Sequence, residues 1–185
     1  MTFQVSKRLL NIEDYHKMAA AGILPDSGIE LVNGEIIEMS PIGSKHLSCV
    51  NTLMELLFEN LGRKVIISIQ NPIQAGDFSE PEPDIAVLKR TPKRYADKIP
   101  TAEDVLLVIE VADTSLAYDR EVKLPIYAES GIPEFWLINL DQQEIEAYWQ
   151  PSGNTYKYRA LLRAKDIVEA QYFELKIPVD AILAP

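Results

Sequence analysis

A glutamate interrupts an otherwise apolar segment near the middle of the chain. Glu110 lies in the run Val105–Ala112, whose other residues are all valine, leucine, isoleucine or alanine. Such a run is typical of a strand that is buried on both faces. An ionised carboxylate there loses its hydration, which destabilises the fold unless a cation or hydrogen-bond donors compensate. Glu110 therefore indicates chemistry rather than packing.

A second carboxylate, Asp84, opens another apolar segment directly after Glu80-Pro81-Glu82-Pro83. By itself, an aspartate that follows a proline is most often a turn residue at a strand end. Glu110 changes this interpretation, because two strands that each bring one carboxylate to the same end of a sheet form an oxygen-rich site. Mg²⁺ and Mn²⁺ prefer such sites, so we expect Asp84 and Glu110 to share a divalent ion.

A lysine can reach this site from the helix expected after the Glu110 strand. On a helix, Asp119, Lys123 and Tyr127 lie at i, i+4 and i+8 and share one face. A lysine in that position can orient an attacking water and offset the charge of a pentavalent phosphate. The alternative, which spacing alone favours, is an exposed Asp119–Lys123 ion pair that contributes only about 0.3–0.5 kcal/mol.

Four further polar residues are weaker candidates. His46 lies near a helix start and could face the cleft, although a single histidine there is more often a local hydrogen-bonding residue. Gln70 ends a strand and could contact a phosphate or a water. Glu30 and Glu35 flank a hairpin turn and could add an acidic ligand, but such residues are more often ordinary cross-strand polar residues.

The composition is that of an ordinary globular protein, with 185 residues of which 47% are hydrophobic and 25% charged. It predicts a single domain over residues 1–185. No apolar run approaches the roughly 20 residues that span a bilayer, and no signal peptide is visible. One cysteine, Cys49, excludes an intrachain disulfide. We therefore expect a cytoplasmic protein without a membrane partner.

The net charge of −10 opposes non-specific adhesion to nucleic acid, which requires a basic surface. A local basic groove is still compatible with this charge, because five cationic residues fall within one short segment. They are Lys89, Arg90, Lys93, Arg94 and Lys98. The alternative is a solvated loop, because runs of charged residues are usually only that.

The expected elements alternate between strands and helices. We expect helices at about 12–21, 45–61 and 119–130, and strands at about 29–32, 35–39, 65–69, 84–88, 105–112, 135–140, 144–149, 156–162 and 172–175. Asn33-Gly34 is a strong hairpin signal, and Asn11 and Ser44 are expected N-caps. Strand, helix and strand over 105–140 predict a parallel crossover. The predicted class is mixed α/β (α+β), with a central sheet flanked by helices and extra antiparallel strands at both ends.

These motifs together resemble the PD-(D/E)XK nuclease core and, more closely, the Uma-type restriction endonuclease family. The core is carried by Pro83-Asp84 and Ile109-Glu110-Val111, and the most specific stretch runs from Asp119 through Lys123 to Trp136. Further matching stretches are residues 30–35, 40–41 with His46, and 81–87. The resemblance implies a restriction-endonuclease-like fold and a divalent metal held by the two carboxylates.

The chain departs from the usual nuclease core at one position. That core places a lysine two residues after the glutamate, where this sequence has Ala112. In the Uma-type group the lysine is moved to the following helix, and Lys123 matches that place, so activity would depend on Lys123. The family's usual serine shortly after the glutamate is Asp113 here, which adds an acid close to the site.

The leading hypothesis is a Mg²⁺- or Mn²⁺-dependent endonuclease that hydrolyses phosphodiester bonds in DNA. Asp84, Glu110 and the backbone carbonyl of Val111 would hold the metal, and Lys123 would position the water. The supporting residues would be His46, Tyr127, Glu35, Gln70 and Asp119.

Two alternatives stay open. One is a catalytically degenerate binding or assembly module, which the acidic charge favours, and the other is a metal-dependent hydrolase of small phosphate esters. In the binding module, the Phe135-Trp136 region and the C-terminal strands could form the contact surface of a homodimer.

Overall fold

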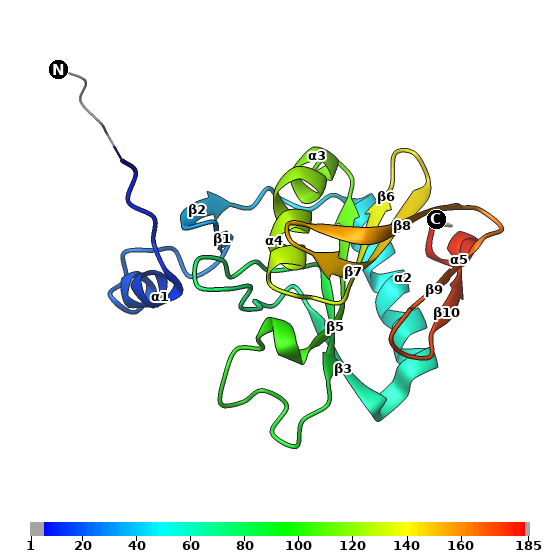
Figure 1. Ribbon diagram of the computed structural model, residues 1–185, viewed down its shortest axis with the longest axis horizontal. Helices are drawn as coiled ribbons and strands as arrows, with labels where there is room; N and C mark the ends of the chain where they lie inside the picture. Colours follow the sequence, from blue (N-terminus) through cyan, green and yellow to red (C-terminus); the bar gives the residue numbers. More distant parts are fainter. Residues whose placement is uncertain (1–5, 184–185) are drawn as a thin grey trace.

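The computed structural model describes residues 6–183, and a six-stranded mixed sheet lies at its centre (Figure 1). The strand order is β3 (Val65–Ile69), β4 (Ile85–Lys89), β5 (Val105–Ala112), β6 (Glu134–Asn139), β7 (Glu144–Ser152) and β8 (Thr155–Arg163). Neighbouring strands run antiparallel except β5 and β6, which are parallel. The predicted central mixed sheet is confirmed.

A helical segment joins the parallel pair, as a parallel connection requires. It consists of α3 (Leu116–Tyr118), the π-helical turn η3 (Asp119–Lys123) and α4 (Leu124–Glu129). The π turn closes where the N–H of Leu124 donates to the carbonyl of Asp119. Pro125, which has no N–H to donate, follows directly at the start of α4, so the irregular π turn lies where the segment cannot continue a regular α-helical hydrogen-bond pattern. The predicted helix is confirmed and begins three residues earlier than expected.

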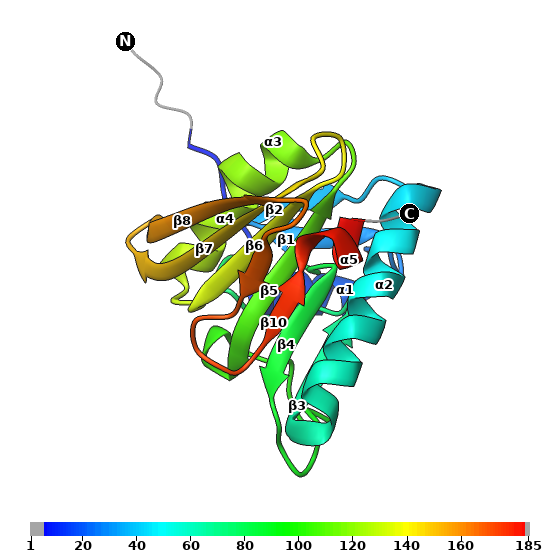
Figure 2. The ribbon, with the colours of Figure 1, turned by 90° about the vertical axis from the view of Figure 1, so that its right-hand side faces the viewer.

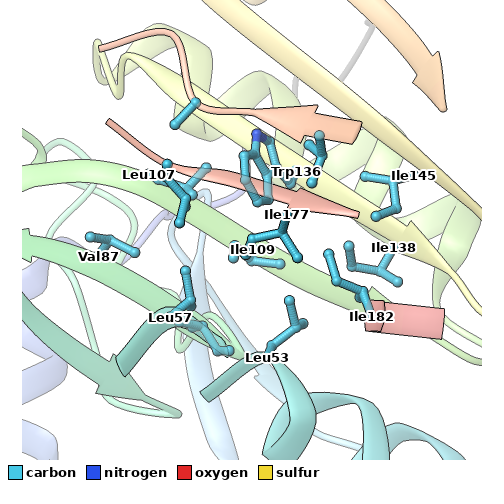
Figure 3. Packing of buried hydrophobic residues seen from close by; sticks show 14 of the residues in the cluster. Leu53, Leu57, Val87, Leu107, Ile109, Trp136, Ile138, Ile145, Ile177 and Ile182 are labelled. Atoms are coloured by element: carbon cyan, nitrogen blue, oxygen red, sulfur yellow. The ribbon is translucent and has the colours of Figure 1, made fainter. Parts of the chain in front are cut away.

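Two apolar cores lie on opposite faces of the sheet. On one face, α2 (Ser44–Leu61) and α5 (Val179–Leu183) cover the strands (Figure 2), and Leu53 and Leu57 pack near Ile109 (Figure 3). The other core contains Tyr127 from α4. Because side chains alternate along a strand, Ile109 faces α2 whereas Glu110 faces the helical connection.

A separate hairpin and the first helix lie beside the central sheet (Figure 1). The hairpin pairs β1 (Ile29–Val32) with β2 (Glu35–Glu38), and α1 is Ile12–Ala20. Asn33 and Gly34 both have positive φ, 50° and 77°, as the hairpin turn requires. Asn11 caps α1 by accepting from the N–H of Asp14 at 2.7 Å. Both local predictions are confirmed.

Two local predictions are wrong. The N-cap of α2 is Gly43, which offers no side-chain bond, and Ser44 is already helical. The strand expected at 172–175 is absent from the described C-terminal region. Residues 171–174 instead form the bend between β9 (Ile167–Glu169) and β10 (Lys176–Pro178), which pair with each other. Short 3₁₀ turns η1 (Gly62–Lys64) and η2 (Ala102–Asp104) precede β3 and β5.

The Phe135-Trp136 part of the expected dimer surface is wrong, because both side chains are fully buried within the two cores of one chain. The part formed by the C-terminal strands stays a prediction. Within residues 6–183, none of the helices combines the length and apolarity needed to cross a bilayer.

Candidate active site

Asp84 and Glu110 lie next to each other at one end of β4 and β5. The antiparallel register pairs Ile85 with Ile109, which sets Asp84 opposite Glu110. Each carboxylate accepts a backbone N–H from the other strand: Asp84 N donates to Glu110 Oε2 at 3.2 Å, and Val111 N donates to Asp84 Oδ2 at 2.8 Å. This reciprocal pair of bonds fixes both carboxylates relative to the sheet.

Two side chains from the helical connection contact Glu110. Lys123 Nζ donates to Glu110 Oε1 at 3.1 Å, and the Tyr127 hydroxyl donates to the same oxygen at 2.6 Å. Asp119 does not pair with Lys123 but accepts from the Ser115 hydroxyl at 2.5 Å. All three helical residues are buried. The alternative of an exposed Asp119–Lys123 ion pair is therefore wrong.

Glu30, from β1, completes the environment of Lys123. Its Oε2 lies 3.4 Å from Lys123 Nζ and accepts the N–H of Glu82 at 3.1 Å. Glu35, on the other strand of the hairpin, lies outside the cleft and pairs with Lys7. The site residue that sequence reasoning undervalued is thus Glu30. The signal that marks it is the one that marks Glu110, a glutamate within an apolar strand.

His46 and Gln70 contact the carboxylate of Asp84. His46 Nε2 lies 2.9 Å from Asp84 Oδ2, and Gln70 Nε2 donates to Oδ1 at 3.4 Å. The hydrogen bond with Asp84 raises the pKa of His46, against the opposing effect of burial. His46 Nδ1 is buried without a hydrogen-bond partner among residues 6–183. The structure thus brings every predicted site residue except Glu35 into one constellation.

A cleft of about 950 Å³ opens onto these residues, between β2, the start of α2 and α3. Seven carboxylates line it: Glu30, Glu38, Glu82, Asp84, Glu110, Asp113 and Asp119. Among the described lining residues, Lys123 is the single lysine or arginine. The cleft therefore carries a strong excess of negative charge.

The basic segment 89–98 is not part of the cleft. It follows the far end of β4, five residues from Asp84, and forms a loop at the opposite end of the sheet (Figure 1). Several of its cations have partners there: Lys93 pairs with Asp97 at 2.8 Å, and Lys98 pairs with Asp104 at 2.5 Å. The alternative of a solvated loop fits this placement, and a basic groove at the cleft does not.

Burial controls the protonation of the site. Burial raises the pKa of Glu110 to about 8. The ammonium group of Lys123 lowers this pKa, and the carboxylate of Asp84 raises it. Burial also raises the pKa of Glu82 and Asp119. For Lys123, burial lowers the pKa, but Glu110, Glu30 and Asp119 outweigh it and keep the pKa above its ordinary value. A proton on Glu110 would therefore offset part of the negative charge, and a cation could replace it.

The donor set fits a hard divalent cation. Glu110 Oε2 and Asp84 Oδ1 each accept a single hydrogen bond, and a carboxylate oxygen can accept about two. Within residues 6–183, no three or more His, Cys, Asp or Glu side chains are grouped so as to hold an ion by themselves. Mg²⁺ takes oxygen ligands, keeps several waters and needs only one or two carboxylates.

The chain matches the family model Uma2, which carries the description "Putative restriction endonuclease", over residues 12–180. The chain belongs to the Uma2 family. Its fold is similar to the crystal structure of "a putative nuclease belonging to DUF820" from Anabaena variabilis ATCC 29413, with a TM-score of 0.75. The two chains are 18% identical, and the match covers 95% of this Uma2 chain and 98% of the other. No curated protein matches. The predicted family and the predicted restriction-endonuclease-like fold are confirmed.

Proposed function

We propose that this Uma2 family member is a Mg²⁺- or Mn²⁺-dependent endonuclease that hydrolyses phosphodiester bonds in DNA. One observation carries the proposal: Asp84 and Glu110 share one end of adjacent strands, and a buried lysine contacts Glu110. Membership of a nuclease family supports the same reaction class.

Each residue of the constellation has a role in this reaction. Asp84, Glu110 and the Val111 carbonyl would hold the ion, which would polarise the phosphate and lower the pKa of the attacking water. Lys123 donates from its ammonium group to orient that water and to balance charge on the phosphate. Tyr127 fixes the rotamer of Glu110, and His46 and Gln70 fix that of Asp84, as outer partners of metal ligands do.

Cleavage of supercoiled plasmid DNA with Mg²⁺ or Mn²⁺ tests the proposal. Asp84→Asn, Glu110→Gln and Lys123→Met should each lower the rate at least about 100-fold, because each removes a group that acts on the reacting phosphate. Glu35→Gln is the matched control and should cut like wild type, because Glu35 lies outside the cleft. If wild type cuts no DNA, or the three site variants cut as fast as wild type, the proposal fails.

A second candidate is a hydrolase of small phosphodiesters, and the lining of the cleft favours it. Seven carboxylates and one lysine offer few contacts to the flanking phosphates of a polymer. Metal-dependent turnover of bis(p-nitrophenyl) phosphate, together with no cleavage of DNA, would favour this candidate. Salt-dependent DNA binding without any turnover would instead favour a non-catalytic module.

A further inference from the structure

Two carboxylates from different parts of the chain hold the same buried ammonium group. Lys123 Nζ lies 3.1 Å from Glu110 Oε1 and 3.4 Å from Glu30 Oε2. Glu110 comes from β5 of the central sheet, whereas Glu30 comes from the separate hairpin. The three side chains are each less than a tenth exposed, so solvent screens their charges only weakly.

This arrangement matters when a second cation arrives. In the proposed function, Glu110 is shared between Lys123 and a divalent ion. Two cations on one carboxylate repel each other, and the repulsion is strong in a buried site. Without another anion, Lys123 would either compete with the ion for Glu110 or leave its place in the cleft.

We infer that Glu30 is a positioning residue, which holds Lys123 in place while Glu110 binds a divalent cation. The inference rests on the proposed metal site. Glu30 neutralises the ammonium group that Glu110 can no longer neutralise alone, so that the lysine and the ion occupy the site together.

The surroundings of Glu30 suit this role because they fix its carboxylate. The N–H of Glu82 donates to Oε2 at 3.1 Å, and the Tyr118 hydroxyl contacts Oε1 at 3.5 Å. The neighbouring Leu31 forms a β-bridge with Glu80, in the segment that leads to Asp84. The hairpin is thus hydrogen-bonded to the segment that leads to Asp84, which holds Glu30 in place if Lys123 moves.

Calorimetric titration of the metal-free protein with Mn²⁺ tests the inference through a double-mutant cycle. Glu30→Gln should weaken Mn²⁺ binding roughly tenfold when Lys123 is present and no more than about threefold in the Lys123→Met background. The loss of the Glu30 charge should weaken Mn²⁺ binding equally with and without Lys123. The additional weakening seen only when Lys123 is present therefore measures repositioning of the lysine. Glu82→Gln, which also removes a cleft carboxylate, should act equally in both, and Glu35→Gln should change nothing.

The outcomes separate the two proposals. An equal effect of Glu30→Gln in both backgrounds overturns the positioning role and leaves the metal site standing. No saturable Mn²⁺ binding by wild type overturns the metal site, and the positioning role with it.

A second measurement needs only Glu30→Gln and covers the case in which Lys123→Met does not fold. In ¹⁵N-lysine spectra, the buried Lys123 ammonium should give a slowly exchanging signal that survives saturation with Mg²⁺ in wild type and exchanges at least about tenfold faster in Glu30→Gln. An unchanged signal in Glu30→Gln with Mg²⁺ overturns the inference.

Discussion

Glu110 accepts hydrogen bonds from three donors, and this explains how a strand can carry a buried carboxylate. The donors are the Lys123 ammonium, the Tyr127 hydroxyl and the N–H of Asp84. A buried acid with this many partners is stable only while the partners stay in place. The protonation of Glu110 therefore depends on the positions of these donors.

Metal binding should depend on pH through Glu110. Its pKa of about 8 is above the ordinary value, chiefly because of burial, so below pH 8 an incoming ion must displace a proton. Mn²⁺ affinity should rise by up to about tenfold per pH unit between pH 6 and 8 and level off above. Calorimetry from pH 6 to 9 checks this, and a flat profile would contradict it.

The same shift affects the stability of the metal-free protein. Between about pH 5 and 8 the folded state holds a proton on Glu110 that the unfolded chain has released. The free energy of unfolding should therefore fall as pH rises through this window, and saturating Mg²⁺ should oppose the fall. Urea denaturation at pH 5.5 and 8 with and without Mg²⁺ measures both effects, and Glu110→Gln should remove this contribution.

The helical connection is anchored to the sheet by a buried acid. Glu146 on β7 accepts from Arg120 of η3, from Tyr148 and from Arg159 of β8. Arg120 directly follows Asp119 and precedes Lys123 by less than one turn. This ion pair therefore helps set the position of the proposed catalytic lysine.

Glu146→Gln should lower the free energy of unfolding by about 2 kcal/mol, because the fully buried carboxylate loses charge-assisted hydrogen bonds. It should also slow DNA cleavage, since η3 carries Lys123. Glu169→Gln, which breaks the exposed pair with Lys176, is the control and should stay within about 0.5 kcal/mol. Equal effects in chemical denaturation would contradict the anchoring role.

Elements with a local signal were predictable from the sequence, and those set by tertiary contacts were not. The strand that carries Glu110 and the hairpin turn at Asn33-Gly34 both lie where expected, because a local pattern predicts each of them. The largely apolar residues 172–175 predict a strand, but residues 171–174 form the bend that lets β9 and β10 pair with each other. Glu30 and Glu35 look alike in sequence, and only the packing of the hairpin brings Glu30 to Lys123.

The negative charge of the protein should limit DNA binding in the absence of metal. The net charge of the chain is −10, and the cleft concentrates part of it, because seven carboxylates and one lysine line it. Binding to a phosphorothioate oligonucleotide should be weaker than about 10⁻⁴ M in EDTA and at least about tenfold tighter with Mg²⁺. Fluorescence anisotropy at several salt concentrations measures it.

The salt dependence should be shallow, with a slope that corresponds to no more than about three phosphates. A steep slope, or tight binding in EDTA, would mean that a basic surface outside the cleft holds the DNA. The segment 89–98 would then be the first place to substitute.

The position of that loop has one more consequence. The connection between β4 and β5 lies at the end of the sheet opposite the cleft (Figure 1), and such exposed loops tolerate cleavage. A cut there would leave Glu30, His46 and Asp84 on one fragment and Glu110 and Lys123 on the other. Because β4 and β5 are hydrogen-bonded neighbours, the fragments would have to reassemble before either had a complete site. The fold thus offers a natural point at which to split the protein, and recovery of the proposed nuclease activity would report that the two fragments have reassembled.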